Sequence, residues 1–449
     1  MIIHIIKNTK ADPRFGHRRG AQSKTPSECQ TGEDVMLKSR ALLAALAATT
    51  ALSIAPLAAS LADDAPVSDP LGVVKIEKGN PIVLGAYSSQ SGPDTPQGID
   101  EQRGMEIAFS EAGDKILDHP IKLISEDSQC TAEGGQETAS KLAANPDVVV
   151  VLGPSCSSVA RAGAPILWNA SIASIGVGAS NPALTASDRP AGFEGFLRVV
   201  PNDQVAGAFA AKYAYQALGA RKAATLHDGT PYTQGLVSVF EAEFKKYGGA
   251  IVAGEAVSPD NTDMRPVLTQ LTSNKPDVLY APLYVQAAAF VARQSKEIPG
   301  MKGVPIVGSE SPFTPSFLTA AGDSAIGFKL ITVSTDAFSS TYPAFVEKYK
   351  DVNGEAPTSG YAAYGHDAAA LAIKAILSVA KTDADGNTYI GRKALRDALF
   401  ATKDLPGLTG TLTCTQYGDC GASSYVALEF TNGDANKYVL GTNPKQVYP

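Results

Sequence analysis

The 449-residue chain is short of histidine and cysteine, two residues that often bind metals, with five of each. It contains a single tryptophan. It also has no excess of basic charge, because 38 lysines and arginines stand against 45 aspartates and glutamates. A net negative chain without a basic run is a poor partner for nucleic acid or an anionic membrane surface. Past residue 62, no apolar run is long enough to cross a bilayer. We therefore expect no nucleic-acid binding and no membrane-spanning segment in that part.

One apolar run stands out near the start of the chain. Two basic residues follow Met36, the apolar stretch covers 41–55, and small residues end it in "SLA" at 60–62. This order is typical of a cleavable secretory signal, so we expect a periplasmic protein of residues 63–449, with 1–35 as an extension upstream of the true start. The mature chain then keeps 30 basic and 41 acidic residues, a net charge of −11. An uncleaved membrane anchor is the alternative.

Four cysteines remain after this leader is removed, which suits an oxidising compartment. Four cysteines allow three pairings. Cys414 and Cys420 close the short loop "CTQYGDC", which makes them natural partners and leaves Cys130 with Cys156. Zinc binding is the rival, but no histidine lies at ligand spacing near any of the four. We therefore expect two disulfides and no metal.

Short apolar runs alternate with helical patterns along the mature chain. The predicted strands cover 81–87, 121–127, 147–153, 170–178, 222–228, 250–257, 277–283 and 304–310. Strands separated by helices of ten or more residues predict βαβ units and a parallel sheet. Two such series predict an α/β chain with two similar lobes. Helices near 343–351, 361–381 and 391–402, followed by short terminal strands, predict that the chain then crosses back between the lobes.

The segment "VVVVLGPSCSSVARAGAPI", residues 148–166, places serines around Cys156 directly after a predicted strand. A nucleophile elbow has the pattern G-x-S-x-G, but Ser157 stands where the second glycine belongs. A secreted hydrolase would use Ser155 as nucleophile and would need a base such as His227, which follows a strand. A disulfide would silence Cys156. We expect no enzyme activity and keep the serine hydrolase as an alternative.

A binding site needs less from the same segment. Serine hydroxyls and free backbone N–H groups at a helix N-terminus form a site for a small anion such as a carboxylate. The alternative is that Ser157 or Ser158 is only the N-cap of its helix. Other strand ends offer Gly178, Ser180, Tyr232, Tyr284 and Glu310. Ligands of open parallel sheets bind at the carboxyl ends of the strands, and hydroxyls together with a lone acid suit a zwitterion such as an amino acid.

The order of these segments resembles the periplasmic leucine/isoleucine/valine-binding proteins, substrate-binding components of ABC importers with the type I periplasmic-binding fold. The resemblance covers essentially all of the mature chain. It is carried by "GAYSSQSGP" (85–93), "ISEDSQCTAEGG" (124–135), "LGPSCSSV" (152–159), "SNPALT" (180–185), "FLRVVPND" (196–203), "HDGTPYTQGL" (227–236) and "VGSESP" (307–312).

The resemblance implies two Rossmann-like lobes with parallel central sheets, joined by three crossing segments and closing like a hinge on a ligand cleft between them. The first lobe would comprise 63–200 and about 335–406, and the second 201–334 and about 407–449. The family works with an ABC permease in the inner membrane and needs no cofactor. We expect a monomer with a small-molecule ligand.

The resemblance also assigns roles to single residues. Ser157 matches the serine that holds the ligand carboxylate, and Gly178 and Ser180 match the loop that contacts both ends of the zwitterion. Glu310 matches the acid that pairs with the ammonium group, and Tyr232 matches a tyrosine of the second lobe. The family disulfide in the first lobe matches Cys130–Cys156, and two further aromatics near the ligand match Tyr284 and Tyr361.

Two positions depart from the branched-chain pattern. Gln97 stands where those proteins carry an aromatic residue, and Ser155 stands where they carry an aliphatic one. Both would line the side-chain end of the pocket, which is then more polar than leucine or valine requires. The ligand is expected to be a branched-chain, small or polar amino acid. A periplasmic sensor or adaptor that binds an amide-like solute remains the alternative.

Overall fold

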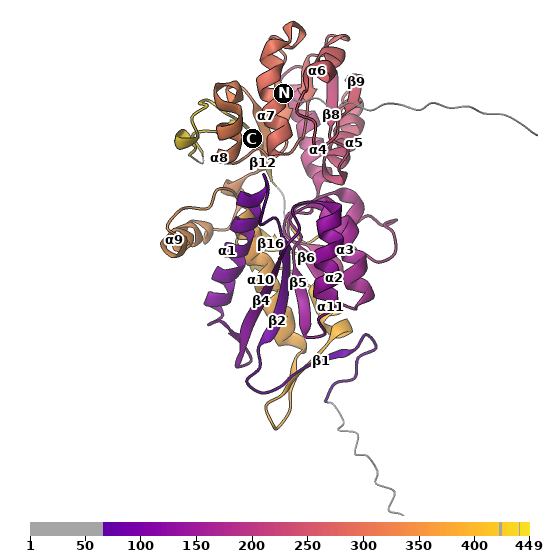
Figure 1. The fold of residues 1–449 in the computed structure, drawn as a ribbon, viewed down its shortest axis with the longest axis vertical. Coiled ribbons are helices and arrows are strands. Elements are labelled where there is room, and N and C mark those ends of the chain that lie inside the picture. The colour runs from indigo at the N-terminus through magenta and orange to yellow at the C-terminus, as the bar shows by residue number, and fades with distance from the viewer. Residues whose placement is uncertain (1–65, 422–423, 440) are drawn as a thin grey trace, which may run out of the picture. The chain divides into compact units, whose positions relative to one another are not determined.

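Two open, mostly parallel sheets run through the part of the chain that the computed structural model describes, residues 66–421, 424–439 and 441–449 (Figure 1). The predicted signal and upstream extension lie outside these residues. From Asp63 onward the chain forms one unit. Among the described residues, no helix has both the length and the apolar character needed to span a membrane.

The first sheet has six strands in the order β3-β4-β2-β5-β6-β7, parallel except for the edge strand β3. Their bounds are β2 (Ile82–Ser88), β3 (Lys115–Ile116), β4 (His119–Asp127), β5 (Val148–Leu152), β6 (Ser174–Gly176) and β7 (Phe196–Arg198). The central strand β5 reads VVVVL and is buried along its whole length. A continuous run of β-branched residues suits a strand covered on both faces, as parallel strands are.

The second sheet has seven strands in the order β18-β17-β12-β11-β10-β8-β9. Their bounds are β8 (Lys222–His227), β9 (Ala250–Ala256), β10 (Val278–Tyr280), β11 (Ile306–Gly308), β12 (Lys329–Val333), β17 (Tyr425–Glu429) and β18 (Lys445–Tyr448). The first five of these along the chain are parallel, and β17 and β18 add antiparallel at the edge.

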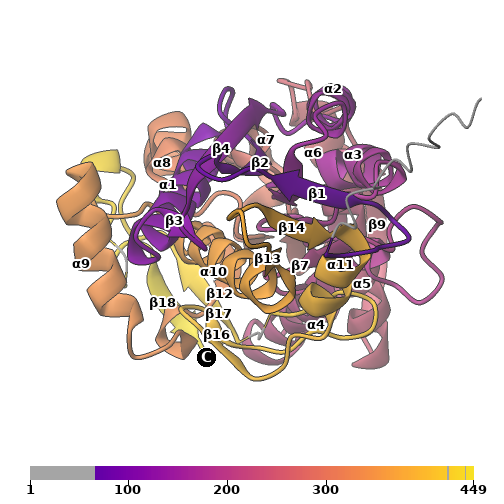
Figure 2. The ribbon, with the colours of Figure 1, turned by 90° about the horizontal axis from the view of Figure 1, so that it is seen from below.

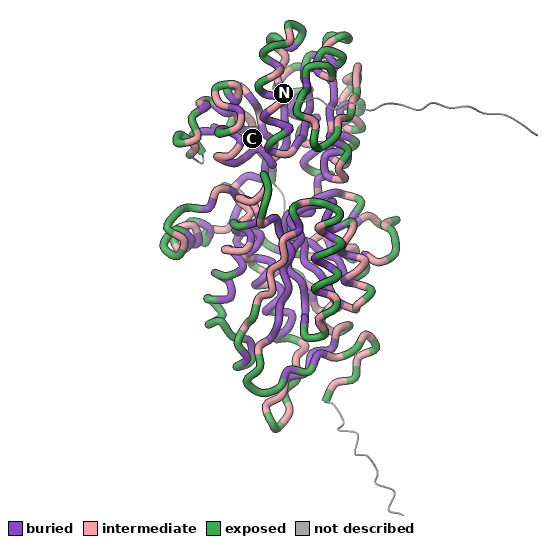
Figure 3. The backbone as a smooth tube through the Cα atoms, viewed as in Figure 1, coloured by how far each residue is buried: buried purple, intermediate pink, exposed green. Residues whose placement is uncertain are grey.

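Helices cover the sheets, and Figure 3 shows that the inner strands of the first sheet are buried beneath them. The α-helices are α1 (Thr95–Glu111), α2 (Ala132–Ala143), α3 (Ser157–Asn169), α4 (Asp203–Lys212), α5 (Pro231–Lys246), α6 (Arg265–Thr272), α7 (Val285–Gln294), α8 (Pro315–Ala321), α9 (Tyr342–Asn353), α10 (Tyr361–Val379) and α11 (Arg392–Phe400). Single turns of 3-10 or π-helix occur at Pro182–Leu184, Tyr213–Ala217, Ser295–Glu297, Pro299–Met301, Gly322–Ala325, Thr335–Ala337 and Ala435–Lys437.

Two smaller sheets complete the fold. One joins β1 (Val73–Ile76) to β14 (Thr388–Gly391) and β13 (Lys381–Thr382), and the other is the hairpin of β15 (Leu405–Gly407) and β16 (Gly410–Leu412). Figure 2 shows β1 beside β14, although the two strands lie far apart in the sequence. Helix α11 follows β14 in the chain and packs against it, and α10 packs against both α1 and β5 of the first lobe.

Both sheets have the same strand order. Numbered along the chain, each set of five parallel strands is arranged 2-1-3-4-5, which is a doubly wound order with one topological switch point. In the first sheet the switch point lies between β2 and β5, and in the second it lies between β8 and β10. The predicted two-lobed α/β fold is therefore confirmed.

The chain passes between the two sheets three times, after β7, after β12 and before β17. The last return was expected at about 407, but the structure places it later. The backbone N–H of Leu408 donates to Asp367 Oδ1 of α10 at 2.7 Å, and that of Cys420 donates to Arg198 O at 3.0 Å. Residues 408–420 thus stay with the first lobe, and the second sheet resumes only at Tyr425.

Helices α1 and α10 cross closely because both carry glycine at the crossing. A Cβ on Gly104 would lie 1.9 Å from Ala362 O, and one on Gly365 would lie 2.0 Å from Glu101 O. Only glycine allows this approach of the two backbones. The crossing holds the first turn of α10 beside the first half of α1, and both of these segments reach the candidate site.

Candidate functional site

The first switch point is built from the loops that follow β2 and β5. After β5 the chain turns through Gly153 and Pro154, and α3 begins at Ser157. The structure contains the disulfides Cys130–Cys156 and Cys414–Cys420. The first of these joins the segment before α2 to the residue that caps α3. It therefore ties the loop after β5 to the neighbouring β4–α2 connection.

The N-terminus of α3 is open. Its N-cap is Cys156, whose side chain makes no capping hydrogen bond. Ser157 Oγ accepts from the backbone N–H of Asn181 at 3.1 Å, and Ser158 Oγ donates to Cys130 O at 2.8 Å. Neither serine is the N-cap, so that alternative is wrong. An uncapped helix N-terminus offers backbone N–H groups and the positive end of the helix dipole to an anion.

The loop after β6 packs tightly against the loop after β5. A Cβ on Gly178 would lie 2.2 Å from Ser155 O and 2.5 Å from Gln97 Nε2, so only glycine fits there. Ser180 Oγ donates to Asp203 Oδ2 at 2.8 Å. Arg198 holds the same loop through hydrogen bonds to its backbone carbonyl groups.

Arg198 is a fully buried cation that fixes this loop. Its Nη1 donates to Ala179 O at 3.1 Å and to Asn181 O at 2.8 Å, and its Nε pairs with Asp419 Oδ1 at 2.7 Å. Asp419 lies inside the loop that Cys414–Cys420 closes. The buried charge is thus paired and hydrogen-bonded, as a buried guanidinium must be.

The second switch point supplies aromatic rings. Thr230 caps α5 by accepting from the N–H of Thr233, which places Tyr232 in the first turn. Tyr284 is the N-cap residue of α7, after β10. The two rings lie with their centroids 5.3 Å apart. Each ring therefore stands just beyond the carboxyl end of one of the two strands that flank the switch point.

An acid and a tyrosine connect the two lobes. Glu310 follows β11 of the second sheet, and Tyr361 is the first residue of α10 in the first lobe. The Tyr361 hydroxyl donates to Glu310 Oε1. Burial raises the pKa of Glu310 to about 7, although this hydrogen bond acts in the opposite direction. Burial and the nearby charge of Glu310 raise the pKa of Asp203 to about 8, against the effects of Ser180 and Arg198.

These loops enclose a cavity of about 10 Å³. It is lined by Gln97, Ser155, Cys156, Ser157, Gly178, Tyr232, Tyr284, Ser311 and Tyr361. Of the ligand-binding residues predicted from the sequence, only Ser180 and Glu310 are outside this lining. Both line or contact an adjoining cavity of similar size that includes Asp203 and Tyr232. A space this small holds about one water, so a larger ligand enters only when the surrounding side chains or lobes move apart.

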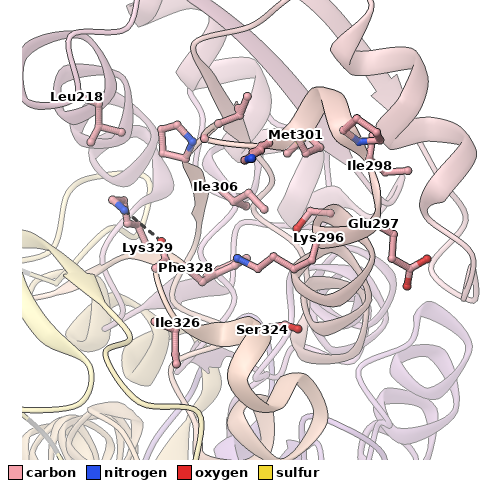
Figure 4. Close-up of a pocket in the computed structure, with 17 residues that line it drawn as sticks. Leu218, Lys296, Glu297, Ile298, Met301, Ile306, Ser324, Ile326, Phe328 and Lys329 are labelled. Atoms are coloured by element: carbon pink, nitrogen blue, oxygen red, sulfur yellow. Dashed lines mark hydrogen bonds between the residues drawn. The ribbon is translucent and has the colours of Figure 1, made fainter.

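A larger cavity lies elsewhere. Its volume is about 710 Å³, and Figure 4 shows it lined by residues that include Lys296, Ile306, Phe328 and Lys329. Lys329 Nζ donates to Gly327 O at 3.1 Å and pairs with Glu429. This cavity opens at the amino ends of β11 and β12, opposite the switch points. Because ligands of open parallel sheets bind at the carboxyl ends, the small cavity is the better candidate site.

Residues 81–428 match the family described as periplasmic binding protein. The chain belongs to this family. It is 24% identical over 357 residues to the Leu/Ile/Val-binding protein BraC3 of Rhizobium johnstonii, covering 78% of this chain and 92% of that protein. It is 27% identical over 219 residues to an amino acid binding protein of Pseudomonas aeruginosa, where the match covers 48% of this chain and spans only 57% of that protein.

Solved structures share the fold. The branched-chain amino acid transporter substrate-binding protein LivJ of Streptococcus pneumoniae, in complex with isoleucine, superposes with a TM-score of 0.69 at 23% identity. The superposition covers 82% of this chain and 100% of that one. The family is one of substrate-binding proteins and not of enzymes.

Three residues of this periplasmic binding protein lie at or beside the site although they were not predicted from the sequence. Ser311 lines the cavity, Asp203 contacts Ser180, and Glu101 lies behind Gln97. A signal for Glu101 is present in the sequence, because it falls on the apolar stripe of α1 with Met105 and Ala108. An acid on such a stripe is expensive unless it is bonded, which makes it a candidate for a site.

The serine hydrolase alternative finds no geometric support. The Ser155 hydroxyl donates to Glu101 Oε2, and within the described residues no histidine is hydrogen-bonded to it. His227 Nδ1 instead accepts from the backbone N–H of Gly229 at 3.1 Å. Cys156 is in a disulfide and holds no thiolate for nucleophilic attack.

Proposed function

We propose that this periplasmic binding protein captures an amino acid and delivers it to the permease of an ABC importer. One observation carries the proposal: the uncapped helix N-terminus with Ser157 lines one small cavity, and a buried acid of the opposite lobe, Glu310, lines the adjoining cavity and bonds Tyr361 of the first. These groups suit the carboxylate and the ammonium group of a zwitterion. The names of BraC3 and of LivJ with its bound isoleucine support an amino acid as ligand.

The ligand carboxylate binds Ser157 and the N–H groups of the first turn of α3, with Gly178 leaving room beside them. The ammonium group binds Glu310, assisted by Asp203 behind it. In the structure, the Tyr361 hydroxyl already donates to Glu310. An arriving ammonium group competes for the same carboxylate, and it also favours the ionised form of Glu310. Tyr232 and Tyr284 cover the ligand from the second lobe.

Closure follows from this division of contacts. The first lobe holds the carboxylate end, and the second lobe supplies the acid that neutralises the other end. A ligand that contacts both lobes only when they are together stabilises the closed state by its differential interaction with it. The permease then recognises that closed state. No bond of the ligand is broken, and Ser155 acts as a contact and not as a nucleophile.

The mature protein begins near residue 63 in this proposal, works in the periplasm as a monomer and binds one ligand. The lobes comprise 63–200 with about 335–420, and 201–334 with about 424–449. The upper bound of the first lobe is moved from about 406 because Leu408 and Cys420 bond to first-lobe residues. A sensor that presents the same closed state to a receptor would use the same site.

The test is calorimetric titration of residues 63–449 with each of the twenty common amino acids. We expect at least one to bind with a dissociation constant of about 1 μM or less and a stoichiometry of one, which corresponds to about −8 kcal/mol. If no amino acid binds while an amide without an α-amino acid group or a sugar does, the proposal is wrong. Deletion of the gene for the partner ABC permease separates an importer from a sensor. Ligand uptake by the cell is lost only if the protein serves an importer.

A further inference from the structure

A buried carboxylate lies behind the side-chain end of the cavity. Glu101 on α1 is fully buried, and its two oxygens have different partners. Oε2 accepts from the Ser155 hydroxyl, and Oε1 accepts from Gln97 Nε2 at 2.9 Å. Gln97 and Ser155 both line the cavity, whereas Glu101 does not. Glu101 therefore acts on the ligand space through the hydrogen bonds of these two side chains, and its Oε1 also lies beside Gly178, where a Cβ would be 3.0 Å away.

The hydrogen bonds to Glu101 determine which polar atoms of Gln97 and Ser155 remain available to a ligand. Gln97 Nε2 has two acceptors, Glu101 Oε1 and, at 3.5 Å, Ser155 O, so its amide nitrogen faces inward. The amide oxygen Oε1 has no hydrogen-bond partner within the described residues. Ser155 uses its only proton on Glu101, which leaves its oxygen lone pairs, one of them near the N–H of Ser89 at 3.4 Å. Both side chains are left as acceptors.

The charges around the cavity favour the same kind of ligand. None of the residues that line it is basic, while the acids Glu101, Glu310 and Asp203 lie directly behind the lining. An anionic side chain would meet acceptors and these acids. An aliphatic side chain would leave the oxygens of Gln97 and Ser155 without a donor, and sites built to hydrogen-bond a group discriminate strongly against analogues that lack it.

Resting on the proposed amino-acid function, we infer that Glu101 is a specificity-positioning residue. It holds Gln97 and Ser155 as hydrogen-bond acceptors, so that the protein selects an amino acid whose side chain donates hydrogen bonds over aliphatic and acidic amino acids of the same shape. The ligand class is therefore that of amide, hydroxyl or amino side chains. Burial raises the pKa of Glu101 to about 8, although the hydrogen bonds from Ser155 and Gln97 act in the opposite direction. A donor bound to the oxygens of Gln97 and Ser155 favours the ionised form of Glu101, in which both carboxylate oxygens accept.

Asparagine, leucine and aspartate make the decisive comparison, because their side chains have nearly the same shape. The asparagine side chain donates hydrogen bonds, that of leucine is apolar, and that of aspartate is anionic. We expect the wild-type protein to bind asparagine at least tenfold more tightly than leucine and aspartate in calorimetric titration. Threonine against valine repeats the comparison for a hydroxyl group. If leucine or valine binds as tightly as its polar counterpart, the inference is wrong while the proposed function stands. If no amino acid binds, the proposed function itself fails.

Variants test the part played by Glu101. In Glu101→Gln one acceptor becomes a donor, and we expect the ratio of the leucine and asparagine dissociation constants to fall at least fivefold. Glu106→Gln is the matched control. Glu106 lies on the exposed face of α1 and accepts from Gln102 at 2.9 Å, four residues earlier, just as Glu101 accepts from Gln97. The control leaves the ratio unchanged.

A purely structural role for Glu101 would lower stability without changing the ratio between two ligands of one shape. An unchanged ratio in a folded Glu101→Gln protein therefore overturns the inference. If that variant does not fold, Gln97→Leu carries the test, because it removes the free amide oxygen and leaves Glu101 in place. It is expected to reverse the preference in favour of leucine, and a retained asparagine preference overturns the inference.

Discussion

The two lobes share a strand order but place different chemistry at their switch points. At the first, between β2 and β5, the groups are the open N-terminus of α3, small hydroxyls and the amide of Gln97. At the second, between β8 and β10, they are the rings of Tyr232 and Tyr284, with the acid Glu310 just after the next strand, β11. The first lobe thus offers sites for an anion and for donors. The second offers cover and a negative charge.

In the proposed function, this difference divides the recognition of a zwitterion between the lobes. Neither lobe alone would satisfy both charged ends, so the full interaction would be available only when the two lobes meet. Tyr361 crosses this division, because α10 belongs to the first lobe while its hydroxyl bonds Glu310 of the second. Without ligand this hydrogen bond partly replaces the ammonium group.

The lobes also differ in how their loops are held. In the first lobe, Cys130–Cys156 and the buried Arg198–Asp419 pair tie the loops that follow β5 and β6. In the second lobe, aromatic packing holds α5 against β10, where the rings of Phe240 and Tyr280 stack with their centroids 4.2 Å apart. A rigid first lobe that receives the ligand and a second lobe that closes over it are consistent with this contrast.

The largest expected effect comes from removing the acid of the second lobe. Glu310→Gln leaves the ammonium group without a charged partner in a buried site, so we expect amino-acid binding to weaken by about 3 kcal/mol, roughly a hundredfold. Calorimetric titration with the tightest-binding amino acid measures this effect. Glu297→Gln is the control, because Glu297 is exposed in the same lobe and pairs only loosely with Arg265, at 3.5 Å. Equal effects of the two substitutions would remove Glu310 from the site.

A smaller effect is expected from the first lobe. Ser157→Ala removes one hydrogen bond to the ligand carboxylate but leaves the N–H groups of α3, so we expect a loss of about 2 kcal/mol, roughly thirtyfold in affinity. Ser158→Ala is its neighbour control. The Ser158 hydroxyl is used by Cys130 O, so this variant is expected to lose stability and to keep its affinity. The assignment of Ser157 fails if the two variants lose affinity alike.

The smallest effect is a pH dependence that arises mainly from the acid of the second lobe. The pKa of Glu310 in the empty protein is raised to about 7, so lowering the pH protonates it, and an ammonium ligand must then expel that proton. Affinity is therefore expected to fall about tenfold from pH 8 to pH 6. Asp203, Tyr232 and Tyr361 face Glu310, and of these only Asp203, whose pKa is raised to about 8, adds to the change.

Dissociation constants measured at pH 6, 7 and 8 test this dependence, and Glu310→Gln separates the two acids. The variant is expected to lose the part that belongs to Glu310 and to keep the part that belongs to the other two buried acids, Asp203 and Glu101, whose pKa values are both raised to about 8. Affinity that rises on acidification would contradict the sign of the effect and would place a group with a lowered pKa at the ammonium end.

Much of the fold was open to prediction from the sequence. The valine run of β5 and the alternation of short apolar runs with helices are local patterns, and the helices expected near 343–351, 361–381 and 391–402 match α9, α10 and α11. The last return of the chain was expected too early. Leu408 and Cys420 stay with the first lobe through hydrogen bonds to Asp367 and Arg198, partners that lie far away in sequence.

The candidate site divides in the same way. Ser157, Gly178 and Tyr232 follow predicted strands, and the carboxyl ends of parallel strands meet at one edge of a sheet, so their convergence follows from local pattern and topology. Glu101 is different. Its neighbour Ser155 is 54 residues away, and its contact with the loop of Gly178 depends on how closely α1 approaches β5 and β6.

The alternation of strands and helices, the cysteines available for pairing and the residue types at each strand end follow from the local sequence, because all of these depend on neighbours along the chain. The folding of the whole chain is needed to place the rings of one lobe in the same cavity as the serines of the other. It also decided that Tyr361 bonds Glu310, and that Gln97 and Ser155 turn their donors toward Glu101. These contacts join residues that are near in space but far in sequence, and the hydrogen bonds of a buried acid depend on the groups that packing brings to it.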